Sequence, residues 1–479
     1  MSFAPLLRFA APGEQSQPLV EELAPGVEAQ EAFLRLAARP HCLFLDSARR
    51  EPTLGRYSFV TADPFACLQL PVDSCDALER LAAELAPFRS ATVPELPPFQ
   101  GGAAGLFSYD LGRQLERLPE PRRDEFRAPA LAIGMYDVVV AYDHVREQCW
   151  LISHGWPERD PARRRDRAAT RLREFKAWLA APPAHVPRAD RNLLPAEHLA
   201  PQFPVGGLPD LTSNFTRDDY LRAVERAIEY IAAGDIFQVN LAQRLLYPAH
   251  DDSVQLYLRL RERNPATFAG YFDLGEFQIA SASPERFVQV LQRRVEARPI
   301  KGTRQRTRLP EADLFAGDEL QASEKDRAEN VMIVDLLRND LSRVCRPDSV
   351  HVSQLCGLET YEYVQHLVSA VCGELRDDCQ PLDLLKAAFP GGSITGAPKV
   401  RAMEIIAELE PTARGAYCGA LGYLGFDGAL DSNLLIRTIT AGRGWRQAPV
   451  GGGIVYQSVP ALEYEETWHK AEGLLRALK

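Results

Sequence analysis

The sequence lacks the features that would place the chain in a membrane or outside the cell. No apolar run approaches the roughly 20 residues that a membrane span needs. The N-terminal residues Met1 to Pro5 have neither the charged nor the apolar region of a signal peptide. The 9 cysteines are an odd number without any Cys-x-x-Cys pair, which argues against a zinc site or a disulfide framework and predicts free, reduced thiols. We therefore expect a cytoplasmic protein.

An excess of basic residues is also missing. The formal net charge is −10, which argues against a nucleic-acid partner. An anionic small molecule would need a local positive site, because the overall field repels it. No internal repeat interrupts the 479 residues, a length that suits two or three average domains or one large interlocked fold.

One change in composition divides the chain. Residues 157–212 are rich in proline, arginine and alanine, and they predict a linker that carries a charged surface helix at 162–179. This linker separates an N-terminal region, 1–156, from a C-terminal region, 213–479.

Signals for helices and strands interleave in the C-terminal region, which indicates a mixed α and β class. Thr216 can cap a helix that runs to residue 233, just before Gly234. Residues 236–247 partly alternate in the manner of a strand. The polar face of that strand, with Gln238, Asn240 and Ala242, can either line a cavity or face water.

Residues 460–479 predict an amphipathic helix. Its apolar stripe, predicted to be core, consists of Tyr464, Trp468, Ala471, Leu475 and Leu478. A neighbouring face carries Glu463, Glu466 and Lys470, which can aim two carboxylates into a pocket or face solvent.

Lys301 is the residue that points most directly to chemistry. It stands in Pro299-Ile300-Lys301-Gly302-Thr303, where a strand-like run meets a tight turn. An ammonium has no lone pair, so a nucleophilic lysine must be desolvated or set beside positive charge until its neutral amine is populated. A lone lysine on a turn is more often solvated, so this assignment depends on the surrounding motifs.

Further motifs accompany Lys301 in an order found in a known family: Ser283-Pro284-Glu285, then Pro299 to Thr303, Glu329 to Asp340 and Gly391 to Lys399. Through them residues 213–479 resemble the chorismate-utilising enzymes. Phe44 to Ser47 and Gly55 to Phe59 extend a weaker resemblance into the N-terminal region. The resemblance implies an α+β fold, a two-sheet β-sandwich with helices packed outside, onto which the N-terminal region wraps.

The residue before Gly302 and Thr303 differs between the branches of this family. Anthranilate synthases and the isochorismate and salicylate enzymes usually have alanine there, whereas aminodeoxychorismate synthases typically have lysine. Lys301 therefore implies amination of chorismate to 4-amino-4-deoxychorismate, a precursor of 4-aminobenzoate and folate. Gln238 agrees, because the water-adding branches have a lysine at that place and an amide cannot be a general base. The alternatives are the anthranilate synthase reaction and, from a different class, a non-catalytic regulatory subunit.

The resemblance also implies residue roles. Lys301 matches the nucleophile, and Glu285 matches the general acid for the departing 4-hydroxyl, which requires burial that raises the pKa of the carboxyl group. Arginines and glycine backbones suit the two carboxylates of chorismate. The substrate-binding residues implied in this way are Gly302, Thr303, Tyr417, Arg437 and the loop of Gly451, Gly452 and Gly453, with His366, Ser393, Thr395 and Gln238 beside them.

Four acidic residues suggest a magnesium site. Asp326 and Glu329 are three residues apart, as are Glu463 and Glu466, and the family binds Mg²⁺ between two such helices. Four carboxylates would repel a dianionic substrate without a cation, and Mg²⁺ keeps positions open for substrate oxygen and water. We expect Glu329 and Glu466 as direct ligands, with Asp326 and Glu463 bound directly or through water.

Two further expectations concern partners. None of the cysteines has the setting of a glutaminase nucleophile, so the resemblance implies a separate glutaminase (glutamine amidotransferase) subunit that supplies ammonia. Ser47, with Thr267, Phe268 and Ala269, matches the position of a tryptophan pocket in anthranilate synthases. Residues 267–269 depart from the Pro-Tyr-Met of feedback-inhibited enzymes, which leaves tryptophan binding open and argues against feedback control.

Overall fold

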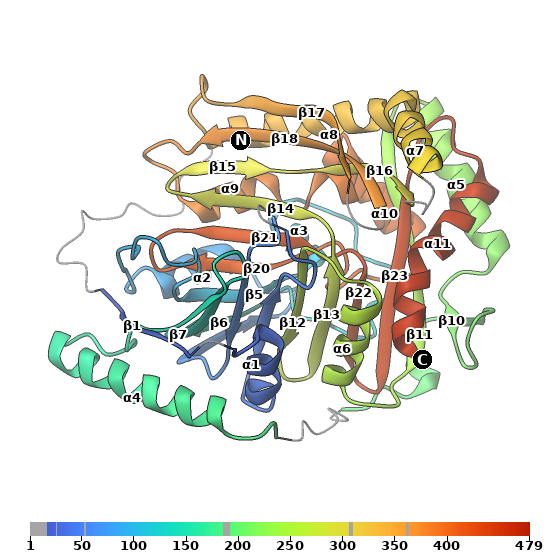
Figure 1. Ribbon diagram of the computed structural model, residues 1–479. Helices are drawn as coiled ribbons and strands as arrows, with labels where there is room; N and C mark the ends of the chain where they lie inside the picture. Colours follow the sequence, from blue (N-terminus) through green and yellow to red (C-terminus); the bar gives the residue numbers. More distant parts are fainter. Residues whose placement is uncertain (1–16, 25, 52–53, 185–191, 306–309, 361–363) are drawn as a thin grey trace.

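The computed structural model describes residues 17–24, 26–51, 54–184, 192–305, 310–360 and 364–479. Within these residues two large antiparallel sheets pack against each other, and helices cover their outer sides (Figure 1). Apolar side chains from both sheets, among them Phe59, Leu106, Phe272 and Leu421, form a shared core. The expected α+β class and two-sheet sandwich are confirmed.

The first sheet contains strands from the whole length of the chain. They are β1 (Leu19–Glu22), β2 (Leu43–Asp46), β3 (Tyr57–Thr61), β7 (Val138–Asp143), β8 (Gln148–Ser153), β9 (Phe203–Pro204), β10 (Thr212–Ser213), β11 (Gln238–Pro248), β12 (Phe268–Asp273), β13 (Phe277–Ser283), β19 (Gly396–Ala397), β22 (Thr438–Gly442) and β23 (Trp445–Ile454). The spatial order is β1-β8-β7-β3-β2-β12-β13-β22-β23-β11-β10-β9, and β19 pairs with β11.

The second sheet is also built from both regions. Its strands are β4 (Ala66–Leu70), β5 (Gly102–Phe107), β6 (Leu131–Tyr136), β14 (Arg286–Leu291), β15 (Arg294–Ala297), β16 (Ile300–Gln305), β17 (His351–Thr360), β18 (Val364–Glu374), β20 (Ala420–Gly425) and β21 (Leu430–Leu434). The order is β16-β18-β15-β14-β21-β20-β5-β6-β4, with β17 on β18. Because β2 pairs with β12 and β5 with β20, the N-terminal and C-terminal regions share both sheets.

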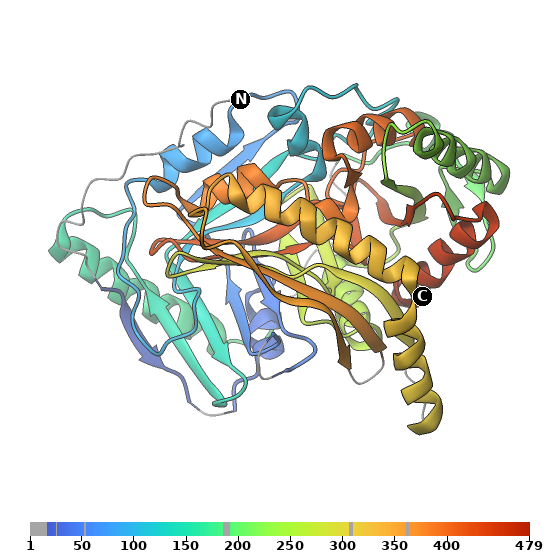
Figure 2. The same ribbon diagram turned by 90° about the horizontal axis from the view of Figure 1, so that it is seen from above.

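Helices cover the two sheets. They are α1 (Ala29–Leu36), α2 (Ala77–Leu85), α3 (Gly112–Leu115), α4 (Pro161–Ala180), α5 (Arg217–Ala232), α6 (Ser253–Arg263), α7 (Pro310–Ala322), α8 (Glu324–Ser342), α9 (Pro381–Ala388), α10 (Lys399–Leu409) and α11 (Pro460–Leu478). Figure 2 shows α8 lying along β17 and β18, which it contacts. Helix α11 packs on β23, so α8 and α11 approach the same end of the sandwich from different sheets.

Local signals placed several helices correctly. Thr216 caps α5, because its hydroxyl oxygen accepts a hydrogen bond from the Asp219 backbone N–H at 3.0 Å. The linker helix is present as α4, with Asp160 as its cap. Its Phe175 and Leu179 are buried, however, so α4 is docked along one side rather than fully on the surface.

The structure decides one face that the sequence left open and differs from one predicted face. Gln238 and Asn240 on β11 are buried, so this polar face does not face water. On α11 the buried stripe runs through Glu463 and Thr467, whereas Tyr464 and Trp468 are only partly buried. The reason is a hydrogen bond of 2.7 Å from Nε2 of Gln243 on β11 to the Thr467 hydroxyl, which turns this polar residue inward.

Candidate active site

Lys301 lies on β16, where that strand pairs with β18. Its Nζ donates a hydrogen bond to the Ser393 carbonyl at 3.2 Å and stands 3.8 Å from Oε2 of Glu329. The side chain is 12 % exposed. The amine is therefore held inside the protein and aimed at the short turn that contains Ser393, not at bulk solvent.

Glu285 follows β13 and is 4 % exposed. Its Oε1 accepts a hydrogen bond of 2.8 Å from the hydroxyl of the same Ser393. Burial raises the pKa of Glu285 to about 7, while the Ser393 hydrogen bond and the charge of Lys301 oppose the rise. A carboxyl group with this pKa is partly protonated at neutral pH, which is the state that a general acid requires.

Gly302 allows the strand to turn beside Lys301. Its φ is +70°, and the pairing of β16 with β18 is irregular between Lys301 and Thr303. A Cβ atom at Gly302 would lie 2.7 Å from Cδ1 of Leu320 and 3.0 Å from Cγ of Asp326. Only glycine suits both the backbone angle and the space. The strand backbone continues through Thr303, whose side chain lies outside the described part of the structure.

His366 on β18 pairs with Thr303. Burial lowers the pKa of His366 to about 4, although a hydrogen bond with the Gly302 backbone opposes this shift. The imidazole is therefore neutral at pH 7. It contacts the backbone of the turn that carries Lys301, and its role in substrate binding stays a prediction.

Arg437 and Tyr417 lie near the α11 carboxylates. Nη1 of Arg437 donates to the Lys470 carbonyl at 2.9 Å. Burial lowers the pKa of Arg437, and the neighbouring Tyr417 and Glu466 side chains oppose that shift. Burial raises the pKa of Tyr417, so it is a neutral phenol. These two side chains can offer one cation and one O–H donor to a carboxylate.

The three glycines at 451–453 form part of a strand, so the predicted loop is wrong. On β23 Gly453 pairs with Asn240 and Gly451 with Ala242 of β11. A Cβ at Gly451 would lie 2.4 Å from the Leu241 carbonyl oxygen, and one at Gly453 would lie 2.1 Å from Nε2 of Gln238. These glycines are required by close packing within the sheet.

Glu463 and Glu466 of α11 are each paired with a lysine. Oε2 of Glu463 and Oε1 of Glu466 both lie 3.5 Å from the position that a Cβ would take at Gly452. Lys325 stands 3.3 Å from Glu463, and Lys470 stands 2.6 Å from Glu466. Although burial raises it, the pKa of Glu466 is held below its ordinary value by Lys470.

Glu329 and Asp326 come from α8. Glu329 is paired with Lys301, and burial raises its pKa against the charges of Lys301 and Lys325. Asp326 lies beside Gly302. Across the described residues, no group of three or more acidic, histidine or cysteine side chains is placed to hold a metal ion by itself.

The arrangement nevertheless fits Mg²⁺. Oε2 of Glu463 is buried and has no hydrogen-bond partner among the described residues, and it shares the space above Gly452 with an oxygen of Glu466. Mg²⁺ commonly uses one or two carboxylates and completes its shell with water and substrate oxygen. Glu463 and Glu466 are therefore the best-placed pair, and Glu329 can join them from α8.

Ser393 and Thr395 have different surroundings. Ser393 contacts both Glu285 and Lys301, whereas the Thr395 hydroxyl donates to the Gly391 carbonyl at 2.9 Å and stabilises the turn. The sequence did not indicate that Ser393 links the acid to the amine, because its contacts come from residues about 100 positions away. Asn240 was also not selected as a site residue, although it stands two positions from Gln238 on the same face of the strand.

The residues of the predicted tryptophan pocket lie around the pairing of β2 with β12. Ala269 pairs with Asp46, next to Ser47. The Ser47 hydroxyl donates to the Tyr57 carbonyl at 2.6 Å, and the Thr267 hydroxyl faces the Pro284 carbonyl at 3.5 Å. Arg286 stacks over the Phe268 ring at 5.0 Å. Tryptophan binding there stays a prediction.

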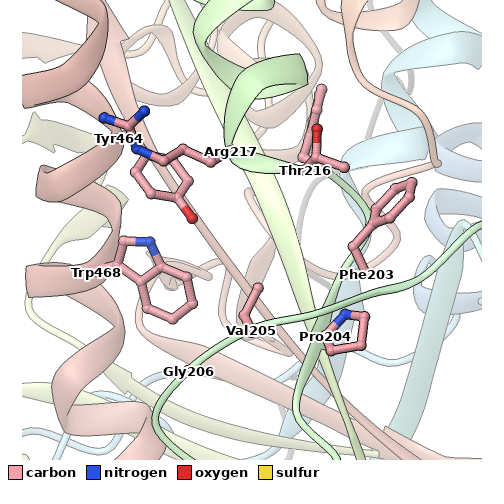
Figure 3. Close-up of a pocket in the computed structure, with 9 residues that line it drawn as sticks. Phe203, Pro204, Val205, Gly206, Thr216, Arg217, Tyr464 and Trp468 are labelled. Carbon is pink, nitrogen blue, oxygen red and sulfur yellow. The ribbon is translucent and has the colours of Figure 1, made fainter.

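A separate cavity of about 550 Å³ lies beside α11 (Figure 3), and neither Glu463 nor Glu466 is among the residues that line it. Tyr464 and Trp468 of α11 face it, together with the start of α5 and residues 203–206. The cavity is therefore distinct from the space around Lys301.

Two sequence expectations can be checked over the whole described structure. All nine cysteines are free thiols. Among the described residues, no helix combines the length and apolar character that a membrane crossing needs.

The sequence and the fold are similar to those of several known proteins. A family model described as "chorismate binding enzyme" matches residues 41–476. The chain is 39% identical over 469 residues to aminodeoxychorismate synthase component 1 of Klebsiella aerogenes, covering 94% of this chain and 96% of that protein. It is 40% identical over 459 residues to anthranilate synthase component 1 of Thermus thermophilus, covering 94% of each. The crystal structure of anthranilate synthase component I from Streptococcus pneumoniae TIGR4 matches with a TM-score of 0.71 and 30% identity, covering 88% of this chain and 92% of that one.

Proposed function

The chain belongs to the family of chorismate-binding enzymes, and we propose that it acts as an aminodeoxychorismate synthase component I. Relatives that carry this name and relatives named anthranilate synthase are about equally similar, so overall identity does not choose between them. The observation that carries the proposal is the placement of Lys301 and Glu285 on either side of Ser393. A largely buried amine and a protonatable carboxyl group are thereby set beside one substrate space.

In the first step the neutral amine of Lys301 attacks C2 of chorismate. The new C2–N bond forms as both ring double bonds shift, from C1=C2 to C1=C6 and from C5=C6 to C4=C5, and the C4–O bond breaks. Glu285 gives its proton to the departing hydroxyl, which leaves as water. The attacking nitrogen loses one proton. The pKa of about 7 at Glu285 supports this role, because the acid form is present near neutral pH.

In the second step ammonia attacks C4 and the bond between C2 and Lys301 breaks. The lysine recovers its proton, and the product is 4-amino-4-deoxychorismate. The net reaction is chorismate plus ammonia to the aminated product plus water. Gln238 supports amination over hydration, since its amide cannot take a proton from water.

The carboxylates of chorismate would bind at the α8 and α11 end of the sandwich. Arg437 supplies a guanidinium and Tyr417 an O–H donor there. Glu463, Glu466 and Glu329 would hold Mg²⁺, which when bound neutralises negative charge between substrate and protein. The free thiols suit a reducing compartment, in which we place the reaction on the route to 4-aminobenzoate and folate. A glutaminase subunit would supply ammonia, as the component 1 names of the relatives suggest.

The test is incubation of the purified chain with chorismate, Mg²⁺ and ammonium at mildly alkaline pH. We expect an aminated product that keeps its enolpyruvyl group and that an added lyase converts to 4-aminobenzoate. Release of pyruvate with 2-aminobenzoate would instead establish the anthranilate synthase reaction. With ammonium omitted, mass analysis of the intact chain should show a covalent adduct of chorismate less one water, and Lys301→Met should abolish it.

A further inference from the structure

The cavity beside α11 is formed by parts of the chain that are far apart in the sequence. Its volume of about 550 Å³ lies within the range of about 300–1,000 Å³ that is typical of small-molecule sites. Figure 3 shows Tyr464 and Trp468 of α11 on one side and residues 203–206 on the other. Residues 215–217, at the start of α5, complete the lining. None of the residues proposed to bind chorismate or Mg²⁺ lines this cavity.

The side of the cavity that comes from the linker is attached to the first sheet. Phe203 and Pro204 form β9, which pairs with Ser213 and Thr212 of β10, and β10 pairs in turn with β11. The proline-rich and glycine-rich segment is therefore not a free connection at this point. Because strand pairing holds this side in place, the cavity exists before any ligand binds.

Aromatic rings line much of the cavity and support one another. The ring of Phe215 lies 5.5 Å from that of Tyr220, Tyr220 lies 5.6 Å from Tyr464, and Tyr464 lies 6.0 Å from Trp468, measured between ring centroids. These separations are favourable for aromatic pairs. Tyr464 and Trp468 are only partly buried, so each leaves part of its ring surface for a ligand. The lining thus suits a flat apolar group.

Arg217 adds a positive charge to this aromatic lining. Its guanidinium carbon lies 5.8 Å from the centroid of the Tyr464 ring, and its side chain forms no hydrogen bond or ion pair with another described residue. Asp219, in the same turn of α5, binds the Thr216 hydroxyl at 2.5 Å and pairs with Arg222 instead. The N–H groups of Arg217 are therefore left for a ligand, and a guanidinium can bind a carboxylate through two parallel hydrogen bonds.

We propose that this cavity binds an aromatic carboxylate. The ring of the ligand lies against Tyr464 and Trp468, and its carboxylate accepts hydrogen bonds from Arg217. An aromatic cation would be repelled by the guanidinium, a neutral aromatic compound would leave the guanidinium without a partner, and an aliphatic acid would not use the ring surfaces. The net charge of −10 makes such a local cation necessary for an anion to bind.

This site is independent of the proposed function, because none of the residues that line it has a role in that reaction. It also differs from the predicted tryptophan pocket, which lies around the pairing of β2 with β12. A failure of either proposal therefore leaves the other unchanged.

The experiment follows the tryptophan fluorescence of the full chain during a titration with benzoate. Of the 5 tryptophans, all of which are within the described residues, only Trp468 lines the cavity. We expect a saturable change that Trp468→Phe removes, because phenylalanine keeps an aromatic ring but not the signal. Benzamide has the same ring without the charge and should bind at least about ten-fold more weakly. Arg217→Gln should weaken the binding of benzoate by a similar factor, since it removes a charge-assisted hydrogen bond.

Two further variants identify the place of binding. Arg222→Gln is the matched control, because Arg222 is on the same helix with a side chain that is 66 % exposed, and it does not line the cavity. Its affinity for benzoate should equal that of the wild type. Arg437→Gln examines whether benzoate binds at the proposed chorismate site instead, and here too we expect an unchanged affinity. Unfolding temperatures close to that of the wild type show that the variants are folded.

Four outcomes would overturn the inference. They are the absence of a saturable change, a change that persists in Trp468→Phe, equal binding of benzamide and benzoate, and a wild-type affinity in Arg217→Gln. Loss of benzoate binding in Arg437→Gln would also overturn it, because the carboxylate would then occupy the space near Lys301.

Discussion

The hydroxyl of Ser393 donates a hydrogen bond to Oε1 of Glu285 at 2.8 Å. The carbonyl of the same serine accepts a hydrogen bond from Lys301. One residue of a short turn thus sets the relative position of the proposed acid and the proposed nucleophile, although they come from separate segments of the chain. The serine also acts on the acid electrostatically, because its hydrogen bond opposes the rise in the pKa of Glu285.

Ser393→Ala should therefore change the pH dependence of the reaction. Without the hydroxyl, the pKa of Glu285 should rise above its value of about 7, and the acid form should persist to higher pH. In the pH profile of kcat/KM for chorismate, the pKa on the alkaline side reports Glu285. We expect this pKa to increase. A pH profile of both proteins measures this. Ser432→Ala is the control, since its hydroxyl donates only to the Val288 carbonyl in a strand pair, and that profile should not move.

Glu285→Gln should raise stability at alkaline pH while it removes activity. The pKa of Glu285 rises from an ordinary 4.5 to about 7 on folding, so its stabilising contribution is complete below pH 4.5 and is lost as the pH increases to about 7. The difference corresponds to roughly 3 kcal/mol. Urea unfolding should find the variant more stable than the wild type at pH 8 and nearly equal to it at pH 4.5. A difference that does not change with pH, or the same pH-dependent difference in the exposed Glu472→Gln variant, would contradict this account.

Gly302→Ala should reduce activity far more than stability. The φ of +70° costs an alanine about 1 kcal/mol, and the new methyl group would press on Leu320 and Asp326. Because Lys301 is the preceding residue, a displacement of about 1 Å can lower kcat about 100-fold. Gly275→Ala is the matched control, since its φ is +91° and no atom lies within 4 Å of the added Cβ. Gly275→Ala should lower the free energy of unfolding by the cost of the backbone conformation, and kcat should not decrease.

The fold could be predicted from the sequence, and Glu285 and Lys301 could be selected together as the proposed acid and nucleophile, because the motifs around them are local. The glycines at 451–453 could not be placed, since glycine runs signal a turn unless the partner strand is known. Here β11 is that partner, and its Leu241 carbonyl and Gln238 amide leave no room for a Cβ.

The buried face of α11 shows the same limit. Two neighbouring stripes of that helix have helical periodicity, and the more apolar one begins at Tyr464 and Trp468. The chain buries Glu463 and Thr467 instead, because Gln243 on β11 binds Thr467. Helical spacing fixes which residues share a face, but a polar partner from another strand decides which face turns inward.

Glu466→Gln should weaken the binding of Mg²⁺, so that the reaction needs a higher Mg²⁺ concentration. The carboxylate shares the space above Gly452 with Glu463, and its loss should raise the Mg²⁺ concentration for half-maximal activity at least about ten-fold. A chelator should abolish wild-type activity, and added Mg²⁺ should restore it. Glu465→Gln changes the exposed neighbour on α11 and should leave the Mg²⁺ titration unchanged. An unaltered titration for Glu466→Gln would remove this residue from the metal site.

Asp340 and Lys399 form an ion pair inside the protein. Nζ of Lys399 lies 2.7 Å from Oδ2 of Asp340 and also donates to the Ala388 carbonyl at 2.7 Å. The pair joins α8 to the start of α10, next to the strand β19 that pairs with Gln238. Both residues stand in motifs that resemble the family, yet among the described residues neither forms a hydrogen bond or an ion pair with Lys301 or Glu285. Their role is therefore to position α8 and α10.

A double-mutant cycle tests that role. Asp340→Leu or Lys399→Met alone leaves one charge buried without its partner, and each should destabilise the chain by about 3 kcal/mol or more. The double variant removes both charges, so its loss of stability should be well below the sum of the single losses. Urea unfolding of the four proteins gives the coupling energy. Additive losses would mean that the two charges act independently, and the link between α8 and α10 would then have to come from apolar packing.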